Sequence, residues 1–317
     1  MKNHKTVEQL ATTAPPLFHE YVEYLKLDRG LMSGTIHNRK GPLINFFIKH
    51  RWLKISKDAK RLSPKAVQKY VRKYSQKLSP EMRKAMLTAL RTFFHFLRIQ
   101  NYHSLDLALA VPHIVSYSNT RTPRPLPIDT ATKLLKVPDR RRPIGRRDYA
   151  ILLLFLKYGV RRKQVTDLLI KDIDWRAGTI YFRAMKGGKP VVVPMDAEVA
   201  TSLLEYLRRD RQNKTYPNVF VKHQTGPTRG QPLGRALWFM VSRHLEKTGL
   251  PASHRYRGPH ALRHTVATEL LQNNQSIKTI ADLLGHKNIN TTSIYAKVDI
   301  KSLRELERPW PGTGRAA

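Results

Sequence analysis

Six side chains in the second half of the sequence are of types that bind phosphate, transfer protons or act as nucleophiles. A guanidinium stays charged at any working pH, and its planar fork matches two oxygens of a phosphate or carboxylate. Lysine and histidine can transfer a proton to or from a reacting group, and a tyrosine hydroxyl becomes a nucleophile when its proton is removed. The six candidates are Arg161, Lys186, His260, Arg263, His286 and Tyr295.

Each candidate also has an ordinary structural explanation. Arg161 can be a solvated surface side chain, and Lys186 lies in a Gly-rich turn where solvated lysines are common. His260 and His264 have the i, i+4 spacing of a zinc-binding helix, but Ala261 stands where a zinc protease has its glutamate. The chain also has no cysteine. We therefore predict no metal site and no cofactor.

The composition restricts the class of partner. The 317 residues include 58 Lys+Arg against 23 Asp+Glu, a formal charge of +35 with a pI near 10.6. The excess is +14 over residues 1–110 and +21 over residues 111–317, so it is not a basic tail on a neutral protein. Repulsion among so many positive charges destabilises a fold, so we expect the protein to bind a polyanion. A basic surface shared by two domains suits double-stranded DNA.

The sequence argues against a membrane or secreted protein. Its longest apolar run, Tyr149–Leu156, has eight residues, whereas a membrane-spanning helix needs about 20. No segment stands out as an amphipathic basic helix with aromatic anchors, and Met1–Lys5 leads into polar sequence with no apolar signal region. We therefore expect a cytoplasmic, nucleoid-associated protein with no membrane partner.

Helix-start signals occur in the first hundred residues. Ser63 and Ser79 each place a capping hydroxyl before a proline at the first helical position. An earlier helix is expected to enter at Thr35, and aromatic side chains at three- and four-residue steps are expected to form the core. We expect four or five helices here, followed by a proline-rich, polar connector.

The pattern then changes to a second domain. Asp129 is expected to cap its first helix, and an apolar helix is expected from about Arg147 to Gly159. Two β-rich runs joined through Gly-Gly predict a hairpin. The strands are expected at 179–182 and 191–193, and further helices at about 196–209, 233–247, 260–273, 276–284 and 290–297.

Taken together and in this order, the six candidates resemble the tyrosine recombinase family, which includes phage integrases and Xer-like enzymes. The resemblance covers nearly the whole chain and rests on the His260-x-x-Arg263 box, the Leu284-Gly285-His286 turn and a tyrosine nine residues later. It implies a mainly α fold with a small antiparallel β-sheet, built as a two-domain, C-shaped clamp. The expected segments are an extension at 1–13, a helical SAM-like core-binding domain at 14–110, a linker at 111–127, a catalytic domain at 128–308 and a tail at 309–317.

The resemblance implies a role for each candidate at the phosphate. Arg161 and Arg263 match the pair that holds the non-bridging oxygens of the scissile phosphate. His260 matches the histidine of the second motif, and His286 matches a histidine that supports the phosphate. The family usually has an acidic residue three positions after the first arginine. Here that residue is Gln164, which can orient a neighbour by hydrogen bonding but adds no negative charge.

The resemblance also implies the covalent step. Tyr295 matches the nucleophile that becomes joined to the DNA 3′ phosphate, and Lys186 matches the lysine that protonates the departing 5′ oxygen. Phosphoryl transfer depends mainly on positioning and charge neutralisation. The phosphotyrosyl link conserves the bond energy, so neither metal nor ATP is expected. Self-association to a tetramer is implied in the synaptic complex, while a second recombinase or a directionality factor stays open.

Several functions stay open at this point. A mobile-element integrase or transposon recombinase is slightly favoured by the basicity, and an Xer-type resolvase of chromosome or plasmid dimers is the alternative. A type IB topoisomerase shares the chemistry, but the short chain and the helical first domain argue against it. A non-catalytic DNA-binding protein is disfavoured because the tyrosine and both arginines are present. The 22 residues after Tyr295, which include Leu303, Leu306 and Trp310, are expected to dock on a neighbouring protomer or to pack on their own domain.

Overall fold

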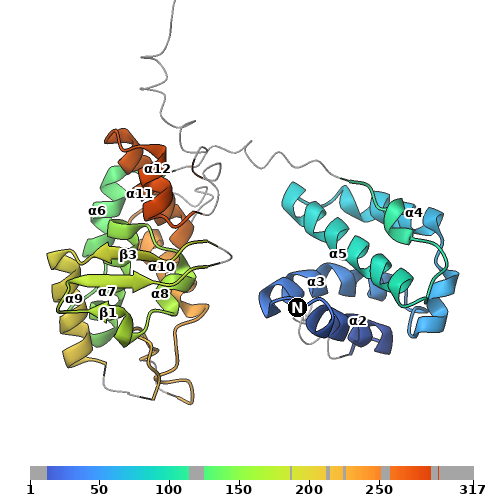
Figure 1. The fold of residues 1–317 in the computed structure, drawn as a ribbon, viewed down its shortest axis with the longest axis horizontal. Helices are drawn as coiled ribbons and strands as arrows, with labels where there is room; N and C mark the ends of the chain where they lie inside the picture. Colours follow the sequence, from blue (N-terminus) through green and yellow to red (C-terminus); the bar gives the residue numbers. More distant parts are fainter. Residues whose placement is uncertain are drawn as a thin grey trace, which may run out of the picture. The chain divides into compact units, whose positions relative to one another are not determined.

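The computed structural model describes residues 13–113, 125–185, 188–211, 215–223, 226–250, 258–286 and 292. The chain divides into two compact units, residues 1–117 and 118–317 (Figure 1). Each unit has its own hydrophobic core. This division falls within the expected linker at 111–127, while the finer domain boundaries stay predictions.

The described part of the first unit consists of four α-helices and two short 3-10 helices. Ser63 Oγ and Ser79 Oγ each accept a hydrogen bond from the backbone N–H three residues later, at 3.2 and 3.3 Å, so both predicted helix starts are confirmed. The helix expected at Thr35 begins two residues earlier, at Ser33. The elements are α2 (Pro16–Leu27), α3 (Ser33–Lys49), η1 (Ser56–Arg61), α4 (Pro64–Ser75), α5 (Pro80–Ile99) and η2 (Leu107–Ala110).

Aromatic side chains fill the core of the first unit. Helix α5 contacts α2, α3 and α4, and edge-to-face ring pairs join these helices. The ring centroid of Phe46 lies 5.6 Å from that of Phe94 and 4.9 Å from that of Tyr70. The rings of Tyr21 and Phe93 are 5.4 Å apart. Such pairs add to the free energy gained by burying their area, and the predicted core role of the aromatic stripe is confirmed.

The second unit is mostly helical and contains one three-stranded antiparallel sheet of order β1-β2-β3. The expected hairpin is confirmed, with Ile180 opposite Val193 and Phe182 opposite Val191. A two-residue strand, β1, pairs with the other side of β2 and was too short to predict. The elements are α6 (Ile128–Lys136), α7 (Pro143–Tyr158), α8 (Arg162–Thr166), η3 (Ile170–Asp172), β1 (Ile173–Asp174), β2 (Thr179–Phe182), β3 (Val191–Pro194), α9 (Ala197–Arg209), α10 (Ala236–Lys247), α11 (Pro259–Gln272) and α12 (Ile277–Leu283).

Two expected helix starts in this unit were wrong. Asp129 is not the N-cap of α6, because the helix begins one residue before it and Pro127 occupies the cap position. Asp129 lies in the first turn instead, where a carboxylate still faces the positive end of the helix dipole. Helix α7 begins at Pro143 and not near Arg147, because a proline at the first helical position loses no hydrogen bond. The helix expected at 290–297 lies outside the described residues, apart from position 292.

Helix α7 passes through the core of the second unit and contacts both α9 and α11 (Figure 1). It carries a buried ion pair next to its apolar residues. Arg147 Nη2 donates to Asp148 Oδ1 at 2.7 Å, and His244 Nε2 of α10 lies 2.9 Å from Asp148 Oδ2. Within the described segments, no helix combines the length and the hydrophobicity needed to cross a bilayer.

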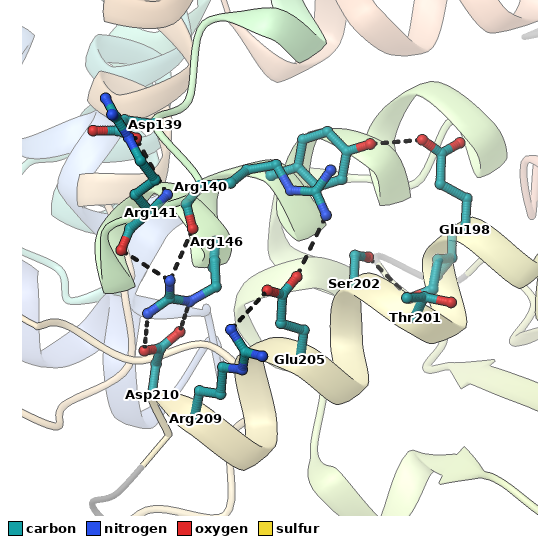
Figure 2. Close-up of polar contacts among 12 residues, drawn as sticks. Asp139, Arg140, Arg141, Arg146, Glu198, Thr201, Ser202, Glu205, Arg209 and Asp210 are labelled. Carbon is teal, nitrogen blue, oxygen red and sulfur yellow. Dashed lines mark hydrogen bonds and ion pairs between the residues drawn. The ribbon is translucent and has the colours of Figure 1, made fainter.

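Charged side chains join the first turn of α7 to the end of α9 (Figure 2). Arg146 donates from Nε and Nη2 to the two carboxylate oxygens of Asp210, both at 2.7 Å. Arg140 adds a weaker contact of 3.4 Å to Glu205 of α9. The bidentate pair is partly buried, so water screens it less than it screens a surface pair. These contacts orient α7, whose other end leads to Arg161.

Candidate active site

Three of the six candidates meet at the turn that follows α12. Arg161 Nη1 donates to the carbonyl oxygens of Leu284 and Gly285, at 3.2 and 3.3 Å. Arg263 Nη2 donates to the same Leu284 oxygen at 2.7 Å and lies 2.7 Å from His286 Nε2. Because both guanidiniums bond one oxygen atom, their nearest nitrogens lie within about 6 Å of each other.

The turn has the geometry that ends many helices with a glycine. Gly285 has a φ of +62°, a left-handed conformation that favours glycine. The His286 N–H donates to Ala281 O at 2.9 Å and the Gly285 N–H donates to Asp282 O at 3.0 Å, which is a Schellman motif. These two bonds supply donors to carbonyl oxygens in the last turn of α12. The carbonyl oxygens of Leu284 and Gly285 accept hydrogen bonds from the arginines instead.

Gly285 is also closely surrounded, so it allows a direct test of this turn. A Cβ at Gly285 would lie 2.9 Å from Val191 Cγ2 and 3.0 Å from the Lys189 carbonyl oxygen. Gly178 has nearly the same φ, +63°, with open space around it. We expect Gly178→Ala to cost about 1 kcal/mol through backbone strain alone, and Gly285→Ala to cost roughly 1–3 kcal/mol more through crowding. Urea unfolding of both variants measures the difference, and equal losses would contradict the close packing described.

The end of α7 supplies a second fixed acceptor for Arg263. Gly159 ends the helix with a φ of +57°, and its carbonyl oxygen accepts from Arg263 Nη1 at 2.7 Å. A Cβ at Gly159 would lie 2.8 Å from Leu284 Cδ2, so α7 ends directly against the turn. Arg263 lies in the second turn of α11, which begins with Pro259 at its first position, and it is 4% exposed.

Gln164 holds the segment that carries Arg161. Its Oε1 accepts from the Arg161 backbone N–H at 2.9 Å, and its Nε2 donates to Arg183 O at 3.2 Å, just after β2. A carboxylate at this position could make the first of these bonds but has no N–H for the second. Gln164, which stands where the family usually has an acidic residue, therefore links Arg161 to the β-hairpin.

The backbone of the β2–β3 hairpin reaches the same turn. A Cβ built at Gly188 would lie 2.7 Å from Gly285 O, so the described end of the hairpin loop packs against the turn. Lys186 itself lies outside the described residues, and its role stays a prediction. It is two residues before Gly188, a stretch of chain that spans at most about 7 Å.

His286 is buried between cationic groups and a hydroxyl. It is 8% exposed, and its Nδ1 lies 2.6 Å from Thr292 Oγ1. Burial, and then the charges of Arg263 and Arg161 and the nearby His264, lower the pKa of His286 to about 4. The ring is therefore neutral near pH 7.

His260 and His264 lie on α11 near Arg263. His260, in the first turn, is exposed, whereas His264 is half-buried. Burial, and then the neighbouring His260 and Arg263, lower the pKa of His264 to about 4. The role predicted for His260 stays a prediction.

The two lowered pKa values predict a pH dependence of stability. Folded-state values near 4 lie below the ordinary value of 6.5, so the unfolded chain binds more protons between these limits. The free energy of unfolding should therefore fall as the pH is lowered from about 6.5 to 4, by roughly 2–3 kcal/mol for His286. Urea titrations between pH 7.5 and 4.5 measure the slope. His286→Gln should flatten part of it, and an unchanged slope would contradict the assignment.

Sequence reasoning missed Thr292, which is 1% exposed and bonded to His286. The signal was present, because Thr292 follows His286 by six residues and precedes Tyr295 by three. Tyr295 lies outside the described residues, but three residues of extended chain span only about 10 Å. The nucleophile predicted from the sequence is thus tied by the covalent chain to the described cluster.

The cluster can bind a tetrahedral anion. Arg161 and Arg263 both donate to the Leu284 carbonyl oxygen, so their guanidinium groups lie side by side at the turn. Guanidiniums bind phosphate through paired, charge-assisted hydrogen bonds. Among the described residues, no group of three or more His, Cys, Asp or Glu side chains could hold a metal ion.

Comparison with known proteins shows which family the sequence belongs to. The profile of the Phage integrase family matches residues 125–301, and that of the phage integrase N-terminal SAM-like domain matches residues 18–101. A protein of Sinorhizobium fredii named as an integrase/recombinase is 35% identical over 292 residues, which cover 92% of this chain and 70% of that protein. Tyrosine recombinase XerC of Thermodesulfovibrio yellowstonii is 28% identical, covering 90% of this chain and 93% of XerC.

Solved structures agree on the fold. The XerH site-specific recombinase, in a post-cleavage complex with its palindromic difH substrate, matches with a TM-score of 0.70. That match is 22% identical in sequence and covers 95% of this chain and 84% of XerH. The family profile covers more than half of the sequence, and the expected resemblance is confirmed. The chain therefore belongs to the phage integrase family of tyrosine recombinases.

Proposed function

We propose that this protein cleaves and rejoins double-stranded DNA at a specific site through a phosphotyrosyl intermediate formed by Tyr295. The observation that carries the proposal is the convergence of Arg161 and Arg263 on the carbonyl oxygen of Leu284. Two guanidiniums from residues 102 positions apart meet at one atom. Their nearest nitrogens lie within about 6 Å of each other. This distance suits the binding of two oxygens of a single phosphate group.

The bound phosphate would replace the carbonyl contacts of the arginines. A phosphodiester is negatively charged and repels nucleophiles, so catalysis requires neutralisation of charge at the phosphoryl group. Arg161 is half-buried and Arg263 is buried, which strengthens their attraction for an anion compared with solvated side chains. His260 is exposed in the first turn of the same helix as Arg263, and we propose that it contacts the DNA backbone.

The proposed reaction consists of two transfers. Tyr295 Oη gives its proton to water, attacks the phosphorus and forms a bond to the 3′ phosphate, while the bond to the 5′ oxygen breaks. Lys186 donates a proton to that oxygen and leaves a 5′-hydroxyl. In the second transfer, a 5′-hydroxyl from a partner strand gives its proton to the now neutral Lys186 and attacks the phosphotyrosine, and the leaving Tyr295 oxygen takes a proton from water. The number of phosphodiester bonds is conserved, so the exchange requires no nucleotide hydrolysis.

We propose integration or excision of a mobile element as the biological role. The Sinorhizobium fredii relative, at 35% identity, is named as an integrase/recombinase, and the +35 charge suits extended contact with DNA. Resolution of chromosome or plasmid dimers is the alternative, favoured by the match to XerC over 90% of the chain. On either account four protomers would join two duplexes in the cytoplasm. Inverted repeats at both ends of a mobile segment, and none at a replication terminus, would support the first role.

The covalent intermediate provides the test of function. Purified protein is incubated with duplexes that tile the DNA flanking the gene, each carrying one nick so that cleavage releases a short fragment and traps the enzyme. We expect an adduct that survives SDS and boiling, forms in EDTA without nucleotide, and disappears on protease treatment. A protein that shifts these duplexes in native gels but yields no adduct on any of them would be a DNA-binding protein without catalysis.

A further inference from the structure

The hydrogen bonds around His286 determine which nitrogen carries its proton. A guanidinium has donors and no acceptor, so Arg263 Nη2, 2.7 Å from His286 Nε2, must donate to it. Nε2 therefore carries no proton. An imidazolium is excluded by the same contact, since it would direct one N–H against another. The neutral ring must carry its proton on Nδ1.

The Nδ1 proton points to Thr292. Thr292 Oγ1 lies 2.6 Å from Nδ1 and is the acceptor of that N–H. Both residues are buried, with Thr292 at 1% and His286 at 8% exposed, so an Nδ1–H without this partner would lose a hydrogen bond that water does not readily replace. The hydroxyl thus stabilises the one tautomer that offers a lone pair to Arg263.

We propose that Thr292 is a positioning residue, which acts through the His286 ring to orient the guanidinium of Arg263 towards the phosphate. This inference rests on the proposed function, in which Arg263 binds the scissile phosphate. This inference gives His286 a different role. Its Nε2 accepts a hydrogen bond from Arg263 and so orients the arginine, whether or not His286 also contacts the phosphate. The inference also makes the orientation of Arg263 depend on a residue three positions before Tyr295.

The chain offers matched variants for this contact. Thr292→Val keeps the shape and removes the hydroxyl, whereas Thr292→Ser keeps the hydroxyl. Thr268→Val is the control, because Thr268 lies in α11, is 3% exposed, and its Oγ1 has no hydrogen-bond partner within the described part of the chain. We expect Thr292→Val to slow adduct formation roughly three- to tenfold, the kinetic equivalent of one neutral hydrogen bond. DNA affinity should change by less than about twofold, and Thr292→Ser and Thr268→Val should stay near wild type.

The tautomer itself can be observed directly in the full chain. Long-range proton–nitrogen correlation spectra of protein labelled with ¹⁵N-histidine distinguish protonated from unprotonated ring nitrogens, and His286→Gln identifies the signals of His286. We expect an Nδ1–H tautomer in wild type and Thr292→Ser, and a loss of that pattern in Thr292→Val. An Nε2–H tautomer in the wild type would overturn the inference, even if Thr292→Val does not fold.

The outcomes separate this inference from the function on which it rests. If wild type forms adducts and Thr292→Val forms them as fast as Thr268→Val, the role of Thr292 is wrong and the recombinase proposal stands. If wild type forms no adduct on any duplex, the recombinase proposal fails, and with it the positioning role. A rate lost in Thr292→Ser but kept in Thr292→Val would show that the methyl packing matters and not the hydroxyl, and would contradict the positioning role.

Discussion

Tyr295→Phe is expected to abolish the covalent adduct on nicked DNA while leaving non-covalent binding within about twofold of wild type. The substitution removes one oxygen atom, and that oxygen is the only atom of the side chain that can bond to phosphorus. Binding depends on neutralising many phosphates along the duplex, so one phenol contributes little to it. Denaturing gels after proteolysis and mass spectrometry locate the modified peptide, and native gels measure affinity at a stated salt concentration.

A second tyrosine provides the matched control. Tyr181 lies in β2, is 40% exposed and has no proposed part in the reaction. Tyr181→Phe should form adducts at the rate of wild type. An adduct retained in Tyr295→Phe, or a modified peptide that lacks position 295, would exclude Tyr295 as the nucleophile.

Arg263→Ala is expected to lower the rate of adduct formation by roughly 10²–10³-fold, which is typical for the loss of one donor to a developing charge. The structure adds a second consequence. Arg263 donates to the buried carbonyls of Gly159 and Leu284, and its removal leaves both without this donor. We therefore expect a loss of stability of roughly 2–4 kcal/mol as well, measured by urea unfolding alongside the single-turnover rate.

Two variants separate these consequences. Arg263→Lys keeps the charge but lacks the planar fork, so it should still be at least tenfold slower than wild type with unchanged DNA affinity. Arg211 is another buried arginine, and it donates to the backbone carbonyls of Tyr216 and Asn218 away from the cluster. Arg211→Ala should lose stability but cleave normally at temperatures where it is folded. If Arg263→Lys loses cleavage and DNA affinity in parallel, Arg263 contacts the DNA backbone without a specific role in the reaction.

Local physical chemistry made much of the fold predictable. The serines at 63 and 79 start helices because a hydroxyl before a proline satisfies a free backbone N–H wherever it occurs. The hairpin follows from two β-rich runs on either side of a short Gly-containing turn, and the helix stop at Gly159 follows from a left-handed backbone conformation that glycine adopts easily. Where these signals competed, as at Asp129 and Pro127, the position of the helix start depended on the neighbouring proline and was predicted wrongly.

The sequence by itself determined the residue types of the candidate site, the hairpin and the turn at Gly285. Only the tertiary structure decided that Arg161 and Arg263 share the Leu284 carbonyl, that Gln164 joins the first arginine to Arg183, and that a threonine holds His286. These contacts join residues 3 to 123 positions apart. Periodicity identifies the buried face of a helix, but the atoms that meet there depend on how α7, α11 and α12 pack together as they bury a shared apolar surface.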